Sequence, residues 1–367
     1  MSTGSVTPDD LFRLLSVDPD DGVFALVRAA RRVKWNFPVT VMSVLAAHGT
    51  ELSDGALAEV RRNRERADRY RAVAAALDGT IEVKGSTLAA AYPPGLTRHT
   101  GDLDLAAPDP DRLWHAAGVV ARRSGARPPK VAITGPDAAV TVSLAWPSAE
   151  DPWLVSDDGV ELVTTPFVGG DGVPLRPVPD AHPVVLSLLA VLEERFQRPF
   201  CAADVLDHAL VLGTLTSDLR AELTDGAIRL RLAPELVALT GLVEDFRPGL
   251  PSPTGLGRLH DAAEAERERR RVVPAPPTLH PGEGFEEFLH RGGTWCGLPL
   301  DDVPAPGFRV VEEGHGGVVV ETPVGGLLLV AAAEVEESSV DEAVEALARA
   351  RLGAGDGNRT RAVSLGS

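Results

Sequence analysis

Cysteine is scarce in this 367-residue chain, where it occurs only at Cys201 and Cys296. The two form no Cys-x-x-Cys pair, which excludes a disulfide framework and a zinc site built from thiolates. Long apolar runs are also missing, because no stretch reaches the roughly 18 residues of a membrane-spanning helix. Asp9, Asp10 and Arg13 interrupt the start, so it does not resemble a secretory signal. We therefore expect a cytoplasmic protein that does not bind a membrane.

Positive charge is in the minority, with 36 Lys and Arg against 53 Asp and Glu and a formal net charge of −17. Such a field disfavours non-specific binding to nucleic acid and to anionic lipid. Aromatic residues make up only 5%, but hydrophobic residues reach 44%, which is enough for a large core. The length predicts about two domains.

Hydrophobic periodicity divides the chain into helical stretches and one stretch that alternates strands and helices. An arginine-rich periodic helix is predicted over 55–77, and its outer face has two interpretations, a solvated face with i,i+4 ion pairs or a nucleotide- or RNA-binding stripe. We predict an N-terminal helical segment over 1–75, a core over 76–180, a helical cap over 181–250, a proline-rich charged linker over 251–280, a small α+β module over 281–352 and a disordered tail over 353–367.

The most informative motif is Lys84-Gly85-Ser86, which follows a predicted strand over 80–83. A glycine beside a small hydroxyl residue lets backbone N–H groups approach a phosphate without a Cβ in the way. After a Pro-Pro-Gly turn, a second predicted strand carries Asp102 and Asp104. Side chains at positions i and i+2 of a strand point to the same face, so the two carboxylates should converge. Paired carboxylates with substrate phosphates suit Mg²⁺.

The order Lys84-Gly85-Ser86, Tyr92-Pro93, Arg98 and Gly101-Asp102-Leu103-Asp104 resembles the minimal nucleotidyltransferase fold of the polymerase-beta-like superfamily. More narrowly, it resembles a family of uncharacterised bacterial nucleotidyltransferases whose core reads Lys-Gly, a short helix, Tyr-Pro, Arg and Asp-x-Asp. The resemblance spans about residues 35–215. It implies an α+β fold in which a mixed sheet with flanking helices lies between helical segments.

The resemblance also implies an activity, the Mg²⁺-dependent transfer of a nucleoside monophosphate from an NTP to an acceptor, whose identity as a small molecule, peptide or protein stays open. It makes Asp102 and Asp104 the catalytic and metal-binding residues. It assigns nucleotide binding to Lys84, Gly85, Ser86 and Arg98. The alternatives are that Arg98 pairs with an aspartate and that Lys84 points to the opposite face of its strand.

The superfamily places a third carboxylate on a later strand, and in the narrower family that strand reads Asp-Leu-His-Trp. The matching segment here is 141–146, which puts Ser143 at the aspartate position and Ala145 at the histidine position. A serine is a weak metal ligand and no general base without a base of its own. Glu161 or Asp137 could supply the missing carboxylate. The alternative is a catalytically impaired homologue that acts as a nucleotide-binding or scaffold protein.

Weaker signals remain open. Asp204 and His208 have the i,i+4 spacing of helical metal ligands, although a hydrogen bond on the helix explains the pair equally simply. The predicted strands of the C-terminal module could bind a peptide or protein partner along an exposed edge. The chain contains no Gly-x-x-x-x-Gly-Lys phosphate loop, and Gly255-Leu256-Gly257 lacks the strand–turn–helix context of a Rossmann fold.

Overall fold

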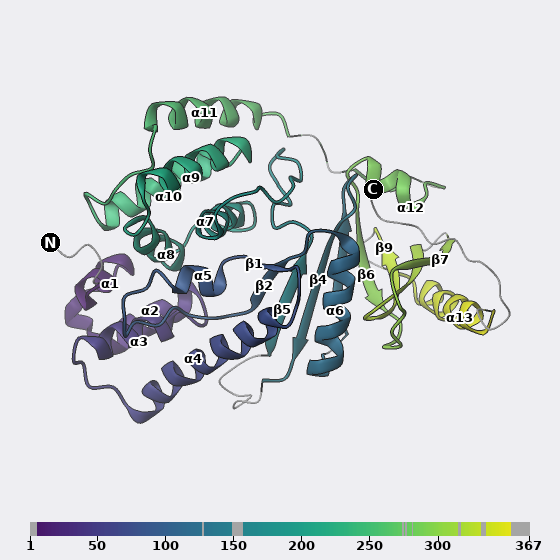
Figure 1. The fold of residues 1–367 in the computed structure, drawn as a ribbon, viewed down its shortest axis with the longest axis horizontal. Coiled ribbons are helices and arrows are strands. Elements are labelled where there is room, and N and C mark those ends of the chain that lie inside the picture. The colour runs from purple at the N-terminus through teal and green to yellow at the C-terminus, as the bar shows by residue number, and fades with distance from the viewer. Residues whose placement is uncertain are drawn as a thin grey trace. The chain divides into compact units, whose positions relative to one another are not determined.

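The computed structural model describes residues 6–126, 128–148, 157–273, 275, 277–280, 282–314, 317–331 and 335–353. These residues form an α+β protein with 13 α-helices and one nine-stranded mixed sheet (Figure 1). The backbone divides into two compact units. The helical unit consists of Met1–Ala72, Glu82–Gly101 and Pro166–Val273, and the sheet unit of Val73–Ile81, Asp102–Thr165 and Pro274–Ser367.

The predicted N-terminal helical segment contains four helices. Helix α1 begins after a capping box, in which Thr7 and Asp10 each accept a hydrogen bond from the other's backbone N–H. Arg64, on the arginine-rich helix, donates from Nε to the Thr97 hydroxyl at 2.7 Å and from Nη2 to the Gly95 carbonyl at 3.0 Å, so part of its outer face is engaged within the helical unit. The four helices are α1 (Pro8–Leu14), α2 (Gly22–Val33), α3 (Pro38–Ala47) and α4 (Asp54–Ala75).

The core of the helical unit forms around α7, whose residues from Val185 to Glu193 are all buried. Gly226 allows α9 to approach α7 closely, because a Cβ at this position would lie 2.8 Å from a methyl group of Leu189 on α7. Such a core depends on apolar side chains interdigitating at high density. The remaining helices of this unit are α5 (Gly85–Ala89), α7 (Pro183–Glu193), α8 (Ala202–Leu212), α9 (Ser217–Arg229), α10 (Ala233–Phe246) and α11 (Leu256–Arg269).

The sheet has the strand order β1-β2-β5-β4-β3-β6-β9-β8-β7. Strand β2 runs parallel to β5, and each pairing from β5 onward is antiparallel. Helix α6 (Pro110–Ser124) packs on β4 and β5 (Figure 1). The strands are β1 (Ile81–Glu82), β2 (Leu103–Ala106), β3 (Lys130–Thr134), β4 (Ala139–Trp146), β5 (Asp158–Val163), β6 (Thr294–Pro299), β7 (Arg309–Gly314), β8 (Gly317–Thr322) and β9 (Gly325–Val330).

The C-terminal residues of the sheet unit extend the sheet. Strand β6 pairs with β3 on one side, with Ala132 opposite Cys296, and with β9 on the other. Because β6 joins β3 to β9, the predicted module over 281–352 shares one sheet with the predicted core. Sequence periodicity predicted strands near β7, β8 and β9 but missed β6. Helices α12 (Phe285–His290) and α13 (Glu337–Gly353) complete the described part of this segment, and the predicted disordered tail beyond Gly353 lies outside the described residues.

None of the described helices is both long and apolar enough to cross a membrane. Of the C-terminal strands that were predicted to present an exposed edge, β8 and β9 have a partner strand on each side, whereas β7 is the last strand of the sheet.

Candidate functional site

A row of polar side chains crosses three neighbouring strands of the sheet unit. Asp104 on β2 is the register partner of Glu161 on β5, and Glu161 is the partner of Ser143 on β4. The Ser143 hydroxyl donates a hydrogen bond to Glu161 Oε2 at 3.3 Å. Because register partners point to the same face of a sheet, the three side chains lie together. The half-buried Asp104 alternates with the buried Leu103 and Leu105, as one polar and one apolar face require.

Asp102 belongs to the same face. It is an exposed residue just before β2, and a Cβ built on Gly159 would lie 3.9 Å from the Asp102 Cβ. Gly159 precedes Val160, which pairs with Leu103, so Asp102 and Gly159 continue the β2–β5 register by one position. The missing side chain at Gly159 leaves space beside the Asp102 Cβ.

Of the two substitutes considered for the missing third carboxylate, only Glu161 lies beside Ser143. Asp137 is in the turn between β3 and β4, whereas Ser143 lies four residues beyond Ala139, the first residue of β4. At about 3.3 Å per residue this separates the turn from Ser143 by roughly 13 Å. Asp137 is therefore wrong as a candidate for this position.

The donors on this face are all oxygens, which is the ligand chemistry that Mg²⁺ prefers. Within the described ranges, no group of three or more His, Cys, Asp or Glu side chains is placed to hold a metal ion. Asp102 and Asp104 therefore fit a Mg²⁺ ion bound by one or two carboxylates and completed by ligand oxygens, and do not form an all-protein cage.

The predicted nucleotide-binding residues Lys84, Gly85, Ser86 and Arg98 all belong to the helical unit, whereas both aspartates belong to the sheet unit. Lys84 has φ +88° and ψ −116°, a backbone conformation that costs a non-glycine residue about 1–3 kcal/mol. Its N–H donates to the Ser187 hydroxyl on α7 at 3.1 Å, which helps to hold this conformation. Strained residues of this kind concentrate at functional sites.

The turn after Lys84 is bonded to a carboxylate of the chain itself. Glu82 accepts hydrogen bonds from the Ser86 backbone N–H and, at 2.6 Å, from the Ser86 hydroxyl. Gly85 has φ +34°, a backbone conformation that residues with a Cβ rarely adopt, which favours glycine at this position. The amide and hydroxyl that were predicted to meet a phosphate thus meet the anion of Glu82.

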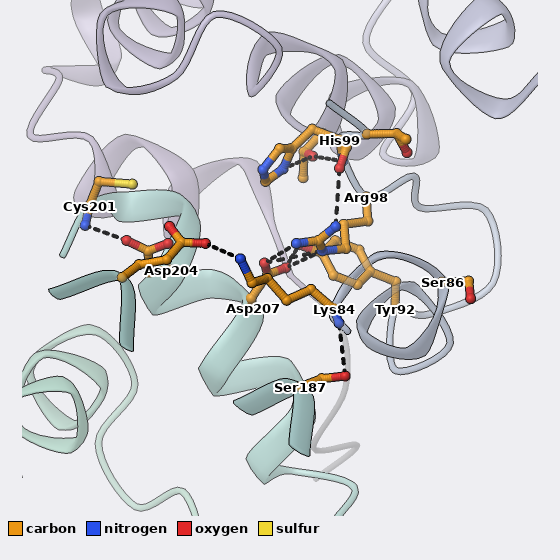
Figure 2. A network of polar contacts seen from close by, with 12 residues as sticks. Lys84, Ser86, Tyr92, Arg98, His99, Ser187, Cys201, Asp204 and Asp207 are labelled. Atoms are coloured by element: carbon orange, nitrogen blue, oxygen red, sulfur yellow. Dashed lines mark hydrogen bonds and ion pairs between the residues drawn. The ribbon is translucent and has the colours of Figure 1, made fainter. Parts of the chain in front are cut away.

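Arg98 pairs with a buried aspartate, whose identity the sequence did not reveal. Its guanidinium donates two hydrogen bonds to the carboxylate of Asp207 on α8, from Nε to Oδ1 at 3.0 Å and from Nη2 to Oδ2 at 2.8 Å (Figure 2). Tyr92 donates from its hydroxyl to the same Oδ1 at 2.6 Å. Burial first, and then the Asp207 charge, raise the pKa of Tyr92 well above its usual value. This arrangement holds the segment from Tyr92 to Arg98 against α8.

A second group of charges surrounds Glu194 in the helical unit. Lys84 Nζ lies 2.8 Å from Glu194 Oε1, and Arg198 pairs with both Glu194 and Asp204. Burial by itself would raise the pKa of Glu194, but the charges of Lys84 and Arg198 outweigh it and lower that pKa to about 2. Glu194 gave no signal in the sequence, because its partner Lys84 lies 110 positions away.

The i,i+4 spacing of Asp204 and His208 does not produce a pair of ligands. Asp204 accepts from the Cys201 N–H at 2.8 Å and binds Arg198, as Figure 2 shows for Cys201. His208 is fully buried, and neither ring nitrogen has a hydrogen-bond partner among the described residues. Burial lowers the pKa of His208 to about 4, so the ring is neutral at neutral pH.

Comparison with protein-family models, with curated proteins and with solved structures finds no match for this chain.

Proposed function

We propose that this protein is a Mg²⁺-dependent nucleotidyltransferase of the polymerase-beta-like type, which transfers a nucleoside monophosphate from an NTP to a hydroxyl acceptor. The observation that carries the proposal is the row of Asp104, Glu161 and Ser143 on one face of the sheet, with Asp102 on the same face. Glu161 stands beside the position where the motif expects its third carboxylate.

Each residue of the row has a separate role. Asp102 and Asp104 would hold Mg²⁺, which supplies neutralisation of phosphate charge when bound. Glu161 accepts a proton from the acceptor hydroxyl, and Ser143 orients Glu161 through its hydrogen bond. Most of the remaining catalysis in this chemistry comes from positioning and charge stabilisation.

Nucleotide binding is proposed for Lys84, Gly85 and Ser86. Because the Glu82 carboxylate occupies the Ser86 amide and hydroxyl, a phosphate binds there only after Glu82 moves away. Arg98 serves as a positioning residue, since its side chain is only 11% exposed and is held by Asp207.

The test is radiolabel transfer from a mixture of NTPs with cell extract as the source of acceptors. The wild type should transfer label in the presence of Mg²⁺. Glu161→Gln should lower the rate by about 10²–10⁴-fold, the usual effect of losing a general base. Ser143→Asp should also reduce transfer, because a second carboxylate beside Glu161 raises its pKa.

The matched control for these variants is Asp111→Asn, which removes an exposed carboxylate on α6 and should transfer label at the wild-type rate. Transfer that persists unchanged in Glu161→Gln would refute the role of Glu161. Transfer that also persists in an Asp102→Asn/Asp104→Asn double variant would refute the site.

The second candidate is a catalytically impaired homologue that binds nucleotide without transferring it. It is favoured by Ser143 at the expected aspartate position and by the lack of a three-ligand group within the described residues. This candidate predicts that calorimetry detects Mg²⁺-dependent binding of ATP or GTP while the wild type transfers no label. Ser143→Asp should then tighten Mg²⁺ binding.

A further inference from the structure

A cavity of about 640 Å³ opens in the sheet unit at the C-terminal end of α6. Its walls come from the last turn of α6, the residues before β3, the connection between β6 and β7, and the turn between β8 and β9. The volume is within the range of roughly 300–1,000 Å³ that is typical of small-molecule sites.

This cavity is distinct from the row of carboxylates. Leu144 on β4 contributes to its wall, whereas the adjacent Ser143 belongs to the row. Successive residues of a strand point to opposite faces of the sheet. The cavity therefore lies on the face of the sheet that α6 covers, and the carboxylates lie on the other face.

The walls are mostly apolar, and their proline residues make them stiff. Five proline rings line the cavity, and proline has a fixed φ, so the backbone around them is restricted before any ligand binds. Asp301 reinforces one wall, because its Oδ1 accepts from the N–H groups of Val303 and Gly326 at 3.0 Å. Its carboxylate is also paired with Arg351. Asp301 is thus occupied by structural bonds.

Two side chains of opposite charge at the cavity lack such structural bonds. Arg122 is on the last turn of α6 and Asp302 is on the β6–β7 connection, and both are exposed. Neither side chain forms a hydrogen bond or an ion pair with another described residue. One guanidinium and one carboxylate beside an apolar surface complement a ligand with a carboxylate, an ammonium group and an apolar body.

We propose that this cavity binds a short zwitterionic peptide with apolar side chains. The peptide carboxylate accepts a forked pair of hydrogen bonds from Arg122. The terminal ammonium group pairs with Asp302, and the side chains lie against the proline rings. A triphosphate is disfavoured because the carboxylate of Asp302 repels it. Peptide binding in this cavity does not depend on the proposed transferase activity.

Calorimetry on the full chain with the dipeptide Leu-Leu tests the proposal. The wild type should bind one dipeptide, and the doubly capped N-acetyl amide should bind at least tenfold more weakly because it lacks both charges. Arg122→Gln and Asp302→Asn should each weaken binding about tenfold or more, as expected for hydrogen bonds to charged groups. Ala126→Phe, which fills part of the cavity, should abolish binding.

The matched controls are Arg123→Gln and Asp341→Asn, which neutralise exposed residues outside the cavity wall and should bind Leu-Leu like the wild type. No binding of Leu-Leu at millimolar concentration would overturn the proposal. Equal binding of the capped peptide would overturn it too, and so would undiminished binding by Arg122→Gln.

Discussion

A single carboxylate, that of Asp207, joins parts of the helical unit that are far apart in the chain. It accepts from Tyr92, which lies 115 positions earlier, and from Arg98. The side chains of Arg98 and Asp207 are 11% and 4% exposed. Removing one partner of a buried pair leaves the other charge uncompensated, which costs much more than the loss of an exposed pair.

We therefore expect Asp207→Asn to lower the free energy of unfolding by about 3–5 kcal/mol in urea denaturation. The control is Asp225→Asn, since Asp225 pairs with Arg258 at the surface, where the side chains are 59% and 61% exposed. That change should cost about 1 kcal/mol or less. Equal losses in the two variants would show that the Asp207 pair has no buried character.

His208 predicts a dependence of stability on pH. Its pKa in the folded state is about 4, whereas an unfolded chain has a histidine pKa of about 6.5. The unfolded state therefore binds a proton first as the pH falls, and stability is lost between about pH 6.5 and 4 at roughly 1.4 kcal/mol per pH unit.

Replacing the ring removes this loss. We therefore compare the free energy of unfolding of His208→Leu with that of the wild type at pH 5 and at pH 7.5. The difference should favour the variant by about 2 kcal/mol more at pH 5. Thermal unfolding at the two pH values measures the difference. His260→Gln, a change at an exposed histidine, should leave the pH dependence as in the wild type. The same pH dependence in His208→Leu would assign it to another group.

Among the elements, the turn between β8 and β9 depends on a glycine. Gly325 has φ +124°, and a Cβ there would collide with the backbone carbonyl of Asp301. Gly325→Ala should lower the free energy of unfolding by about 2 kcal/mol or more, through backbone strain and the displaced Asp301.

Gly307→Ala is the control for this turn, because its Cβ would have no heavy atom within 4 Å and its φ is not left-handed. It should change stability by no more than about 0.5 kcal/mol. Chemical denaturation of both variants measures the contrast. A Gly325→Ala variant as stable as the wild type would mean that the turn relaxes without moving Asp301.

For the molecule as a whole, the continuity of the sheet means that the C-terminal segment is needed by the predicted core. A chain ending at Val273 lacks β6 and leaves the edge of β3 without its partner. Unpaired edges promote association between chains, so we expect the truncated protein to elute as aggregates in size-exclusion chromatography. A chain ending at Gly353 keeps every described element and should elute like the full chain.

A truncated chain that is monomeric and unfolds cooperatively would contradict this expectation. It would support the division suggested by the sequence, in which residues 281–352 form a module of their own.

The local pattern of apolar and polar residues was sufficient to predict most individual helices and strands. The sequence predicted one strand that carries Asp102 and Asp104 and matched another to the segment 141–146, and the structure has β2 from Leu103 and β4 over Ala139–Trp146. The spacing of Asp102 and Asp104 placed them on one face because side-chain direction alternates within a strand. Strand β6 was missed because Gly297 and Pro299 are turn-forming residues, and its place is secured by partners on both sides.

Only the tertiary structure identified the partners of the polar residues. Glu161 lies beside Asp104 and Ser143 only because β5 is inserted between β2 and β4, and nothing in the local sequence specifies that strand order. Likewise, the ion pairs of Lys84 with Glu194 and of Arg98 with Asp207 join residues that lie 110 and 109 positions apart, so the local sequence does not show them. Side-chain direction follows from the geometry of a single strand or helix, whereas strand order and buried ion pairs depend on how the whole chain buries its apolar surface.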